Sequence, residues 1–154
     1  MAASAPTAFT SLAAWQAMLD AHRDLFLQLV PGAWLGIVPR YRTGPDGTRH
    51  SVAVAVTPAV PMVMLIHDGE RMTARAGEFR GLKDLSADAL FVAGDEAVEQ
   101  VQAAAPERRL REMKRHVRTG GVAMFFLRPR RELFERGYEE LFDALGLPVL
   151  GTCR

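Results

Sequence analysis

Sixteen consecutive residues, 51–66, carry no charged side chain. The stretch is rich in valine and is interrupted by Pro58 and Pro61, which lack the backbone donor that a regular element needs. It is also shorter than the roughly 20 apolar residues that a membrane-spanning helix requires. We therefore expect two buried β-strands, over residues 49–57 and 62–67.

Turn residues separate these strands from their neighbours. Gly44, Pro45 and Gly47 suit a reversal between a strand over 34–42 and the strand over 49–57, which would make the pair antiparallel. The strand over 49–57 is apolar on both faces, so we expect it to be central in its sheet. Asp68-Gly69 predicts a tight hairpin between 62–67 and a fourth strand over 71–76.

Helical periodicity brackets the strands on both sides. Apolar residues recur at three- and four-residue spacing over 11–30, and a second such pattern over 131–145 ends at Gly146. Between them we expect helical turns over 82–90, a short strand over 91–93, a helix over 95–104 and a strand over 122–127. Pro106 makes 107–118 either a second helix or a kinked continuation of the first.

This order of elements predicts a single α+β domain. We expect an antiparallel sheet of three to five strands, flanked by an N-terminal helix, a central helical stretch and a C-terminal helix. The domain should span 10–150, between a flexible N-terminus over 1–9 and a C-terminal tail over 151–154. Dimeric secretion chaperones, PAS and roadblock sensor domains and, less closely, acyl-CoA-dependent N-acyltransferases share such an order. The sequence carries no motif specific to any of them, and only Gly94 is present where an acyltransferase has its glycine-spaced pyrophosphate loop.

Composition and targeting signals favour a cytoplasmic protein. Cys153 is the single cysteine, so no disulfide can form within the chain, which suits a reducing compartment. Residues 1–9 contain no Lys or Arg ahead of an apolar segment, so a secretory signal is not expected. We expect no membrane partner.

Sequence motifs for catalysis are absent. The four histidines are not spaced as zinc ligands, and neither a Gly-x-Ser-x-Gly elbow nor a glycine-rich phosphate loop occurs. We therefore expect no metal and no cofactor. His67 and Asp68, which close an apolar strand, are the candidates for acid-base catalysis, and a plain hairpin turn is the alternative. The acids at 95, 96 and 99 are either paired carboxylates or residues that complement a helix dipole.

Charge is distributed unevenly along the chain. The whole sequence has 19 Lys and Arg against 18 Asp and Glu, a net charge of +1. Residues 84–106, however, carry five acids and no base, whereas residues 107–136 carry ten bases and four acids. Helical spacing places four arginines of the basic segment on one face, and three more follow them: Arg108, Arg111, Arg115 and Arg118, then Arg128, Arg130 and Arg131.

Guanidinium groups bind carboxylates and phosphates bidentately, so this Arg-rich face predicts an anionic small molecule or an acidic protein partner. The alternative is a solvated face paired with nearby acids. Our leading hypothesis is a non-catalytic binding or adaptor domain that forms a homodimer. The alternative is a small enzyme of the acyl-CoA-dependent acyltransferase type, or another enzyme whose cofactor bears phosphate. Nucleic acid is not an expected partner, because no exposed aromatic residues are interleaved with the bases.

Overall fold

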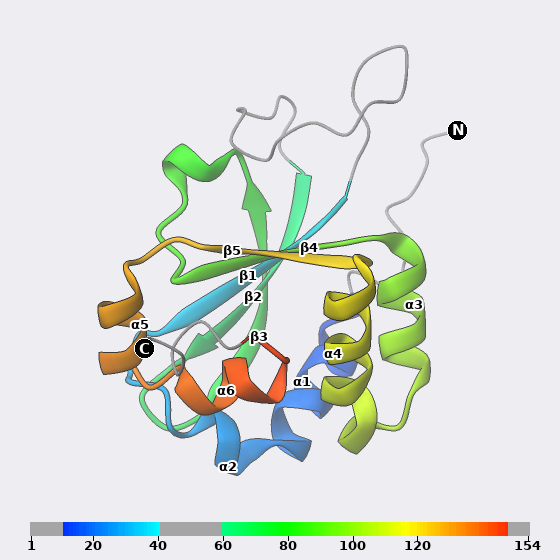
Figure 1. Ribbon diagram of the computed structural model, residues 1–154, viewed down its shortest axis with the longest axis horizontal. Coiled ribbons are helices and arrows are strands. Elements are labelled where there is room, and N and C mark those ends of the chain that lie inside the picture. The colour runs from blue at the N-terminus through cyan, green and yellow to red at the C-terminus, as the bar shows by residue number, and fades with distance from the viewer. Residues whose placement is uncertain (1–10, 41–59, 148–154) are drawn as a thin grey trace.

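The computed structural model describes residues 11–40 and 60–147 (Figure 1). Several sequence predictions concern residues outside these ranges. They are the strand over 49–57 with its central place in the sheet, the loop before it, the flexible N-terminus and the C-terminal tail.

Five strands form one sheet in the order β3-β2-β1-β4-β5. Their bounds are Trp34–Pro39 (β1), Val60–His67 (β2), Met72–Phe79 (β3), Ala89–Ala93 (β4) and Val122–Phe126 (β5). The Asp68-Gly69 turn joins β2 to β3 as predicted, with His67 opposite Met72. The α+β class, the single domain and the flanking helices are confirmed by this arrangement (Figure 1).

One pairing differs from the antiparallel sheet that the sequence predicts. β1 and β4 are parallel, with Leu35 opposite Ala89 and Pro39 opposite Ala93, so the sheet is mixed. The segment between β3 and β4, which includes the short 3-10 helix η1 (Leu82–Asp84), returns the chain so that β4 runs in the direction of β1. A parallel pair joined over such a distance has no turn residues of its own, so local sequence signals cannot reveal it.

Six α-helices are formed by the described residues: α1 (Leu12–Ala21), α2 (Arg23–Phe26), α3 (Asp95–Ala103), α4 (Arg109–Thr119), α5 (Arg130–Glu135) and α6 (Glu139–Ala144). A 3-10 turn, η2 (Pro106–Arg108), separates α3 from α4, so the central helical stretch is two helices. Two predicted helices are each divided in two, 11–30 at His22 and 131–145 before Tyr138. None of the helices in the described ranges is long and apolar enough to cross a membrane.

Gly137 explains the break between α5 and α6. Its φ is 87°, in the left-handed region that side chains other than glycine rarely adopt. A Cβ atom at this position would overlap the carbonyl oxygen of Gln28, in the segment after α2. The turn therefore packs directly on the N-terminal helical segment, a long-range contact that helical periodicity does not report.

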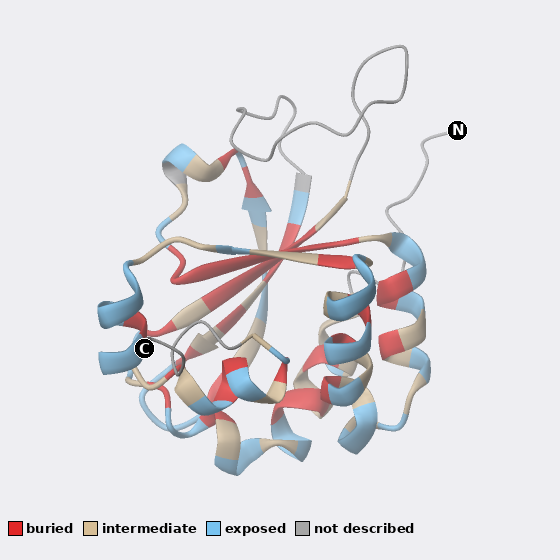
Figure 2. Cartoon of the chain, in the orientation of Figure 1, coloured by how far each residue is buried: buried red, intermediate tan, exposed pale blue. Residues whose placement is uncertain are grey.

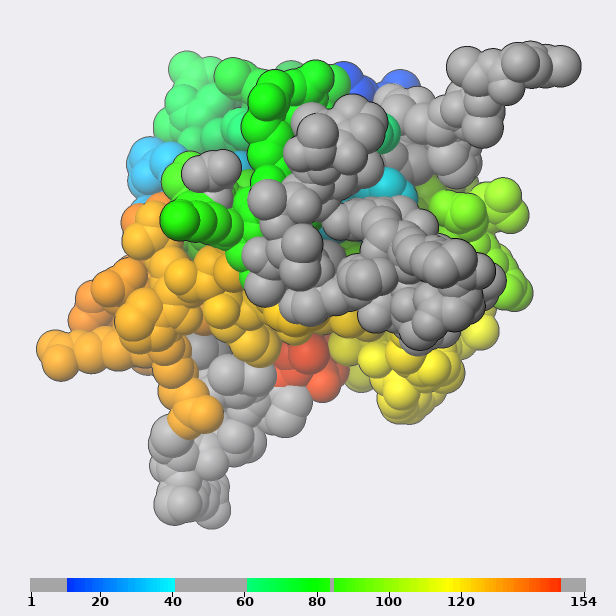
Figure 3. Space-filling view, turned by 90° about the horizontal axis from the view of Figure 1, so that it is seen from above, coloured from blue at the N-terminus to red at the C-terminus, as the bar shows by residue number. Residues whose placement is uncertain are grey.

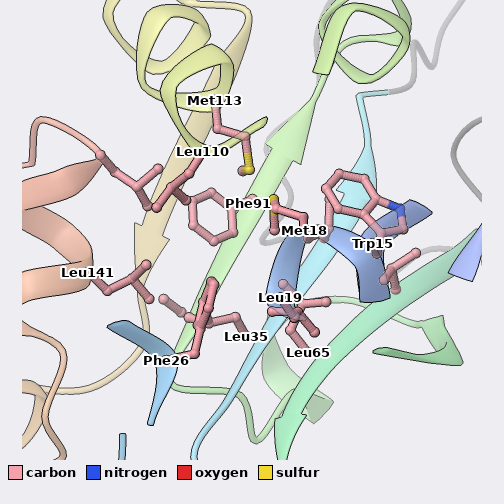
Figure 4. Close-up of a cluster of buried hydrophobic side chains, with 14 of the residues drawn as sticks. Trp15, Met18, Leu19, Phe26, Leu35, Leu65, Phe91, Leu110, Met113 and Leu141 are labelled. Atoms are coloured by element: carbon pink, nitrogen blue, oxygen red, sulfur yellow. The ribbon is translucent and has the colours of Figure 1, made fainter. Parts of the chain in front are cut away.

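The main core lies between the helices and one face of the sheet. Burial follows the inward faces of the helices (Figure 2), and Figure 4 shows Trp15 and Met18 of α1 together with Phe91 of β4 and Leu110 of α4. All five residues of β4 are buried. A smaller core on the other face of the sheet gathers Val38, Met62, Phe79, Leu90 and Val92. The central strands are thus apolar on both faces, as expected of strands covered on both sides.

Candidate functional site

A groove of about 980 Å³ opens at the carboxyl ends of β1 and β4. We call it the strand-end groove. Its walls are the end of β1, the start of α3 and the last turn of α4. Seen from above, the yellow-green atoms of α3 and the yellow atoms of α4 lie together on one side of the molecule (Figure 3). The carboxyl ends of parallel strands, where a helix begins, are a common position for ligands in α/β sheets.

Backbone hydrogen bonds fix the floor of the groove. The amide of Arg40 donates to the carbonyl of Ala93 at 2.8 Å, and the amide of Gly94 donates to the carbonyl of Gly121 at 2.9 Å. Gly94 is also the N-cap of α3 and, as a glycine, offers no side chain to cap it. The first-turn amides of α3 therefore lack the side-chain acceptor that a Ser or Asp cap supplies.

Arg115 stands on the α4 wall within a chain of polar side chains. Its Nη2 donates to Glu112 Oε2 at 2.8 Å and to Gln100 Oε1 at 2.7 Å, and Gln100 Nε2 donates to Glu96 Oε1 at 3.0 Å. The hydrogen bond from Arg115 holds the pKa of Glu112 below its ordinary value. The Arg115 side chain nevertheless remains 48% exposed, so it can still reach a ligand.

Arg40 approaches the groove from the opposite wall. Its Nη2 donates to the carbonyl of Gly120 at 2.9 Å, immediately after the end of α4. This position suits a cation, because the carbonyl end of a helix carries partial negative charge. The contact anchors the guanidinium group of Arg40 at the edge of the groove.

His116 lines the groove but is itself buried. Its Nε2 lies 3.5 Å from Arg115 Nη2 and 3.9 Å from Glu112 Oε2. A Cβ atom at Gly121 would lie 2.9 Å from His116 Nδ1, so the imidazole needs a glycine there. Thr119, the hydroxyl residue of the wall, donates to the carbonyl of Arg115 at 3.1 Å. The Thr119 hydroxyl is therefore engaged with a carbonyl group in the last turn of α4.

The groove thus combines two arginines and a helix N-terminus with two carboxylates, Asp95 and Glu96. The basic groups and the first-turn amides of α3 suit a ligand carboxylate, and the acids suit hydroxyl or ammonium donors on the same molecule. The two carboxylates would repel a highly charged anion. Across the described ranges, no three His, Cys, Asp or Glu side chains come together as metal ligands would.

No family model and no curated protein sequence matches this chain. The chain is similar in structure to a conserved hypothetical protein of Thermus thermophilus, solved in solution and described as a possible sterol carrier protein. The two share 15% sequence identity over 95% of this chain and 92% of that one, with a TM-score of 0.42.

The structure places the predicted arginines of α4 and η2 on the surface. Arg108, Arg111, Arg115 and Arg118 are all exposed, as the helical spacing indicates. Of these four, Arg115 lines the strand-end groove.

The other three predicted arginines lie at the far end of β5. Arg128 ion-pairs with Asp88 and with Glu132, Arg131 pairs with Glu135, and Arg130 begins α5. β5 lies between the two groups of arginines, so they do not form one continuous site (Figure 1).

Arg128 is held by a buried carboxylate at the start of β4. Asp88 is fully buried and is surrounded by the guanidinium groups of Arg128 and Arg136 and by the phenol of Tyr138. Its Oδ2 also accepts the amide of Trp34 at 3.2 Å. The hydrogen bond to Asp88 raises the pKa of Arg128 above its ordinary value. We call these four side chains the Asp88 cluster: Asp88, Arg128, Arg136 and Tyr138. The cluster ties the start of β4 to the segment after β5.

His67 and Asp68 have structural contacts in the β2–β3 hairpin. His67 Nδ1 accepts the amide of Gly69 at 3.0 Å, and Asp68 Oδ1 accepts the amides of Glu70 and Arg71 at 2.9 and 3.0 Å. These backbone hydrogen bonds, Arg71 foremost, hold the pKa of Asp68 below its ordinary value. Neither residue lines the strand-end groove.

Sequence reasoning did not identify Arg40, His116 or Gly94 as site residues. None of them belongs to a local motif, and they meet only because β1 and β4 pair in parallel. One signal was available: Gly94 falls between a short apolar run and a helix with acids in its first turn. Such a strand-glycine-helix junction is a common ligand position, but it identifies a site only when the neighbouring strand is known.

Proposed function

We propose that this chain is a non-catalytic binding domain whose strand-end groove holds a small molecule with one anionic group and several hydrogen-bond donors. Hydroxy acids and amino acids are the chemical class that these groups suit. The observation that carries the proposal is that Arg40 and Arg115 line one groove with the uncapped N-terminus of α3.

The charges of the groove argue for a carboxylate over a multiply charged phosphate ligand. A guanidinium group can bind both carboxylate oxygens, and the N-terminal amides of a helix add donors. Asp95 and Glu96 in the first turn would repel a pyrophosphate, which disfavours a cofactor of the acyl-CoA type.

The contacts of the two potentially reactive side chains of the groove, Thr119 and His116, support binding without catalysis. Thr119 is engaged with a helix carbonyl, and the imidazole of His116 is buried between Arg115 and the Gly121 backbone. Neither group is presented to the groove as a nucleophile with an adjacent base would be.

A thermal-shift panel tests the proposal, because a ligand that binds only the folded state raises the melting temperature. The probes are sodium gluconate, L-glutamate, inorganic phosphate, coenzyme A and oleate. We expect concentration-dependent stabilisation by gluconate or glutamate that Arg115→Ala removes and Arg111→Ala retains. Arg111 is the matched control, since it is exposed on the same helix but does not line the groove. Stabilisation by oleate or coenzyme A alone, or by none of the probes, would refute the proposal.

A further inference from the structure

The two outer edges of the sheet are protected very differently. Among the described strands, β3 and β5 lie at the two edges of the sheet, each hydrogen-bonded to one neighbour. An unprotected edge presents unpaired N–H and C=O groups that can pair with another chain, and proteins usually cover such edges or place charges on them.

The edge of β3 is covered by the Gln16 side chain, which makes the backbone hydrogen bonds that a neighbouring strand would otherwise make. Gln16 of α1 accepts the amide of Ala74 at 2.9 Å through Oε1 and donates to the carbonyl of Met72 at 3.1 Å through Nε2. The strand also carries Arg75 and Glu78. Both devices disfavour the addition of a further strand to β3.

Among residues 11–40 and 60–147, neither device is found at the edge of β5. Its five residues, Val-Ala-Met-Phe-Phe, include no charge. Just before β5, the carbonyl of Gly121 accepts the amide of Gly94. Just after β5, the amide of Leu127 donates to the carbonyl of Asp88. Because antiparallel pairing alternates, Ala123 and Phe125 direct their backbone groups to β4, and Val122, Met124 and Phe126 direct theirs outward.

The outward groups of β5 have no hydrogen-bond partner among the described residues. In Figure 1, β5 lies in front of the other strands, at the edge nearest the viewer. Phe125 adds a side chain that is 36% exposed on the strand itself.

We infer that the outer edge of β5 is a dimerisation edge, at which two copies of this chain pair β5 with β5 in antiparallel orientation and continue the sheet. A second copy is the occupant that fits, because the strand is self-complementary. A two-fold axis through Met124 sets Val122 of one copy opposite Phe126 of the other, so every outward N–H meets an outward C=O. No charge lies within the strand to oppose its own copy.

The inference does not depend on the ligand of the strand-end groove. Light scattering after size-exclusion chromatography measures the assembly, and we expect twice the 16.9 kDa of one chain. Phe125→Lys places a charge beside the paired strands and should give the single-chain mass. Phe134→Lys is the matched control, because Phe134 is 54% exposed on α5 and should leave the dimer intact.

Amide hydrogen exchange of the unmodified chain locates the contact whether or not the variants fold. The amides of Val122, Met124 and Phe126 should exchange slowly at high protein concentration and faster on dilution. A parent chain with the mass of one copy would overturn the inference. So would a dimer whose outward β5 amides exchange freely, or a folded Phe125→Lys variant that remains dimeric.

Discussion

The phenol of Tyr138 donates to Oδ2 of Asp88 at 2.5 Å inside the fold, which joins the start of α6 to the start of β4. Burial, and then the adjacent Asp88 carboxylate, raise the pKa of Tyr138, so the phenol stays protonated. The ring also stacks on Phe142, with centroids 5.1 Å apart. The Tyr138 side chain thus contacts both the buried Asp88 carboxylate and the ring of Phe142.

Removal of the Tyr138 hydroxyl should therefore destabilise the fold while leaving its aromatic packing. We expect Tyr138→Phe to lower the free energy of unfolding by about 1–3 kcal/mol, since a buried charged acceptor loses a donor. Asp88→Asn should cost a similar amount or more, because Arg128 and Arg136 then lack their buried counter-charge. Urea unfolding measures both, with the exposed Asp143→Asn as the control. Equal stability of Asp88→Asn and Asp143→Asn would contradict the role of the Asp88 cluster.

Gly137 and Gly32 form a matched pair for the contact between the C-terminal turn and the segment after α2. Their φ angles are 87° and 85°, so alanine meets the same backbone strain, about 1–2 kcal/mol, at both positions. A Cβ at Gly32 meets nothing within 4 Å, whereas at Gly137 it would overlap the Gln28 carbonyl oxygen. Gly137→Ala should lower the melting temperature well beyond Gly32→Ala. Similar melting temperatures would show that the close approach is unimportant.

Gln16 should protect the β3 edge. Gln16→Ala leaves the Ala74 amide and the Met72 carbonyl without their side-chain partner, at a cost of about 1–2 kcal/mol. The Ala74 amide should exchange faster with solvent in this variant, and the protein should aggregate more readily. Gln28→Ala is the control, because Gln28 is exposed and bonds to the exposed Glu140. An unchanged exchange rate at Ala74 would rule out this role.

His22 should make stability depend on pH. Burial lowers its pKa below the ordinary 6.5, an effect that Glu107 partly opposes, and its buried Nε2 has no hydrogen-bond partner within the described part of the chain. The unfolded chain therefore binds a proton more readily, so this contribution to stability is complete above about pH 6.5 and is lost as the pH falls through the lowered pKa. The melting temperature of the parent minus that of His22→Gln should rise from about pH 5 to about pH 7. A difference that stays constant, or falls, would contradict the argument.

Local signals in the sequence predicted most of the elements and missed what depends on distant contacts. The hairpin at Asp68-Gly69, the strand at β5 and the exposure of Arg115 all follow from spacing or turn chemistry. The parallel β1–β4 pair does not, because no local turn encodes it.

The candidate site was predictable only in part for the same reason. The periodicity of α4 indicates that Arg115 is exposed, but only the register of β1 with β4 brings Arg40 to the same groove. Arg128 illustrates the converse case. It belongs to a basic run in the sequence, yet its partner is Asp88, forty residues earlier in the chain.

The central claim is that the strand-end groove binds a small carboxylate. A titration of the ¹⁵N-labelled chain with sodium gluconate and L-glutamate, followed by amide chemical shifts, tests it most directly. We predict saturable shifts at Gly94, Ala97 and Gly121 that weaken at least tenfold in apparent affinity in Arg40→Ala and Arg115→Ala, a loss of about 1.4 kcal/mol or more, and persist in Arg111→Ala. The absence of shifts, or shifts confined to residues away from the groove, would contradict the account.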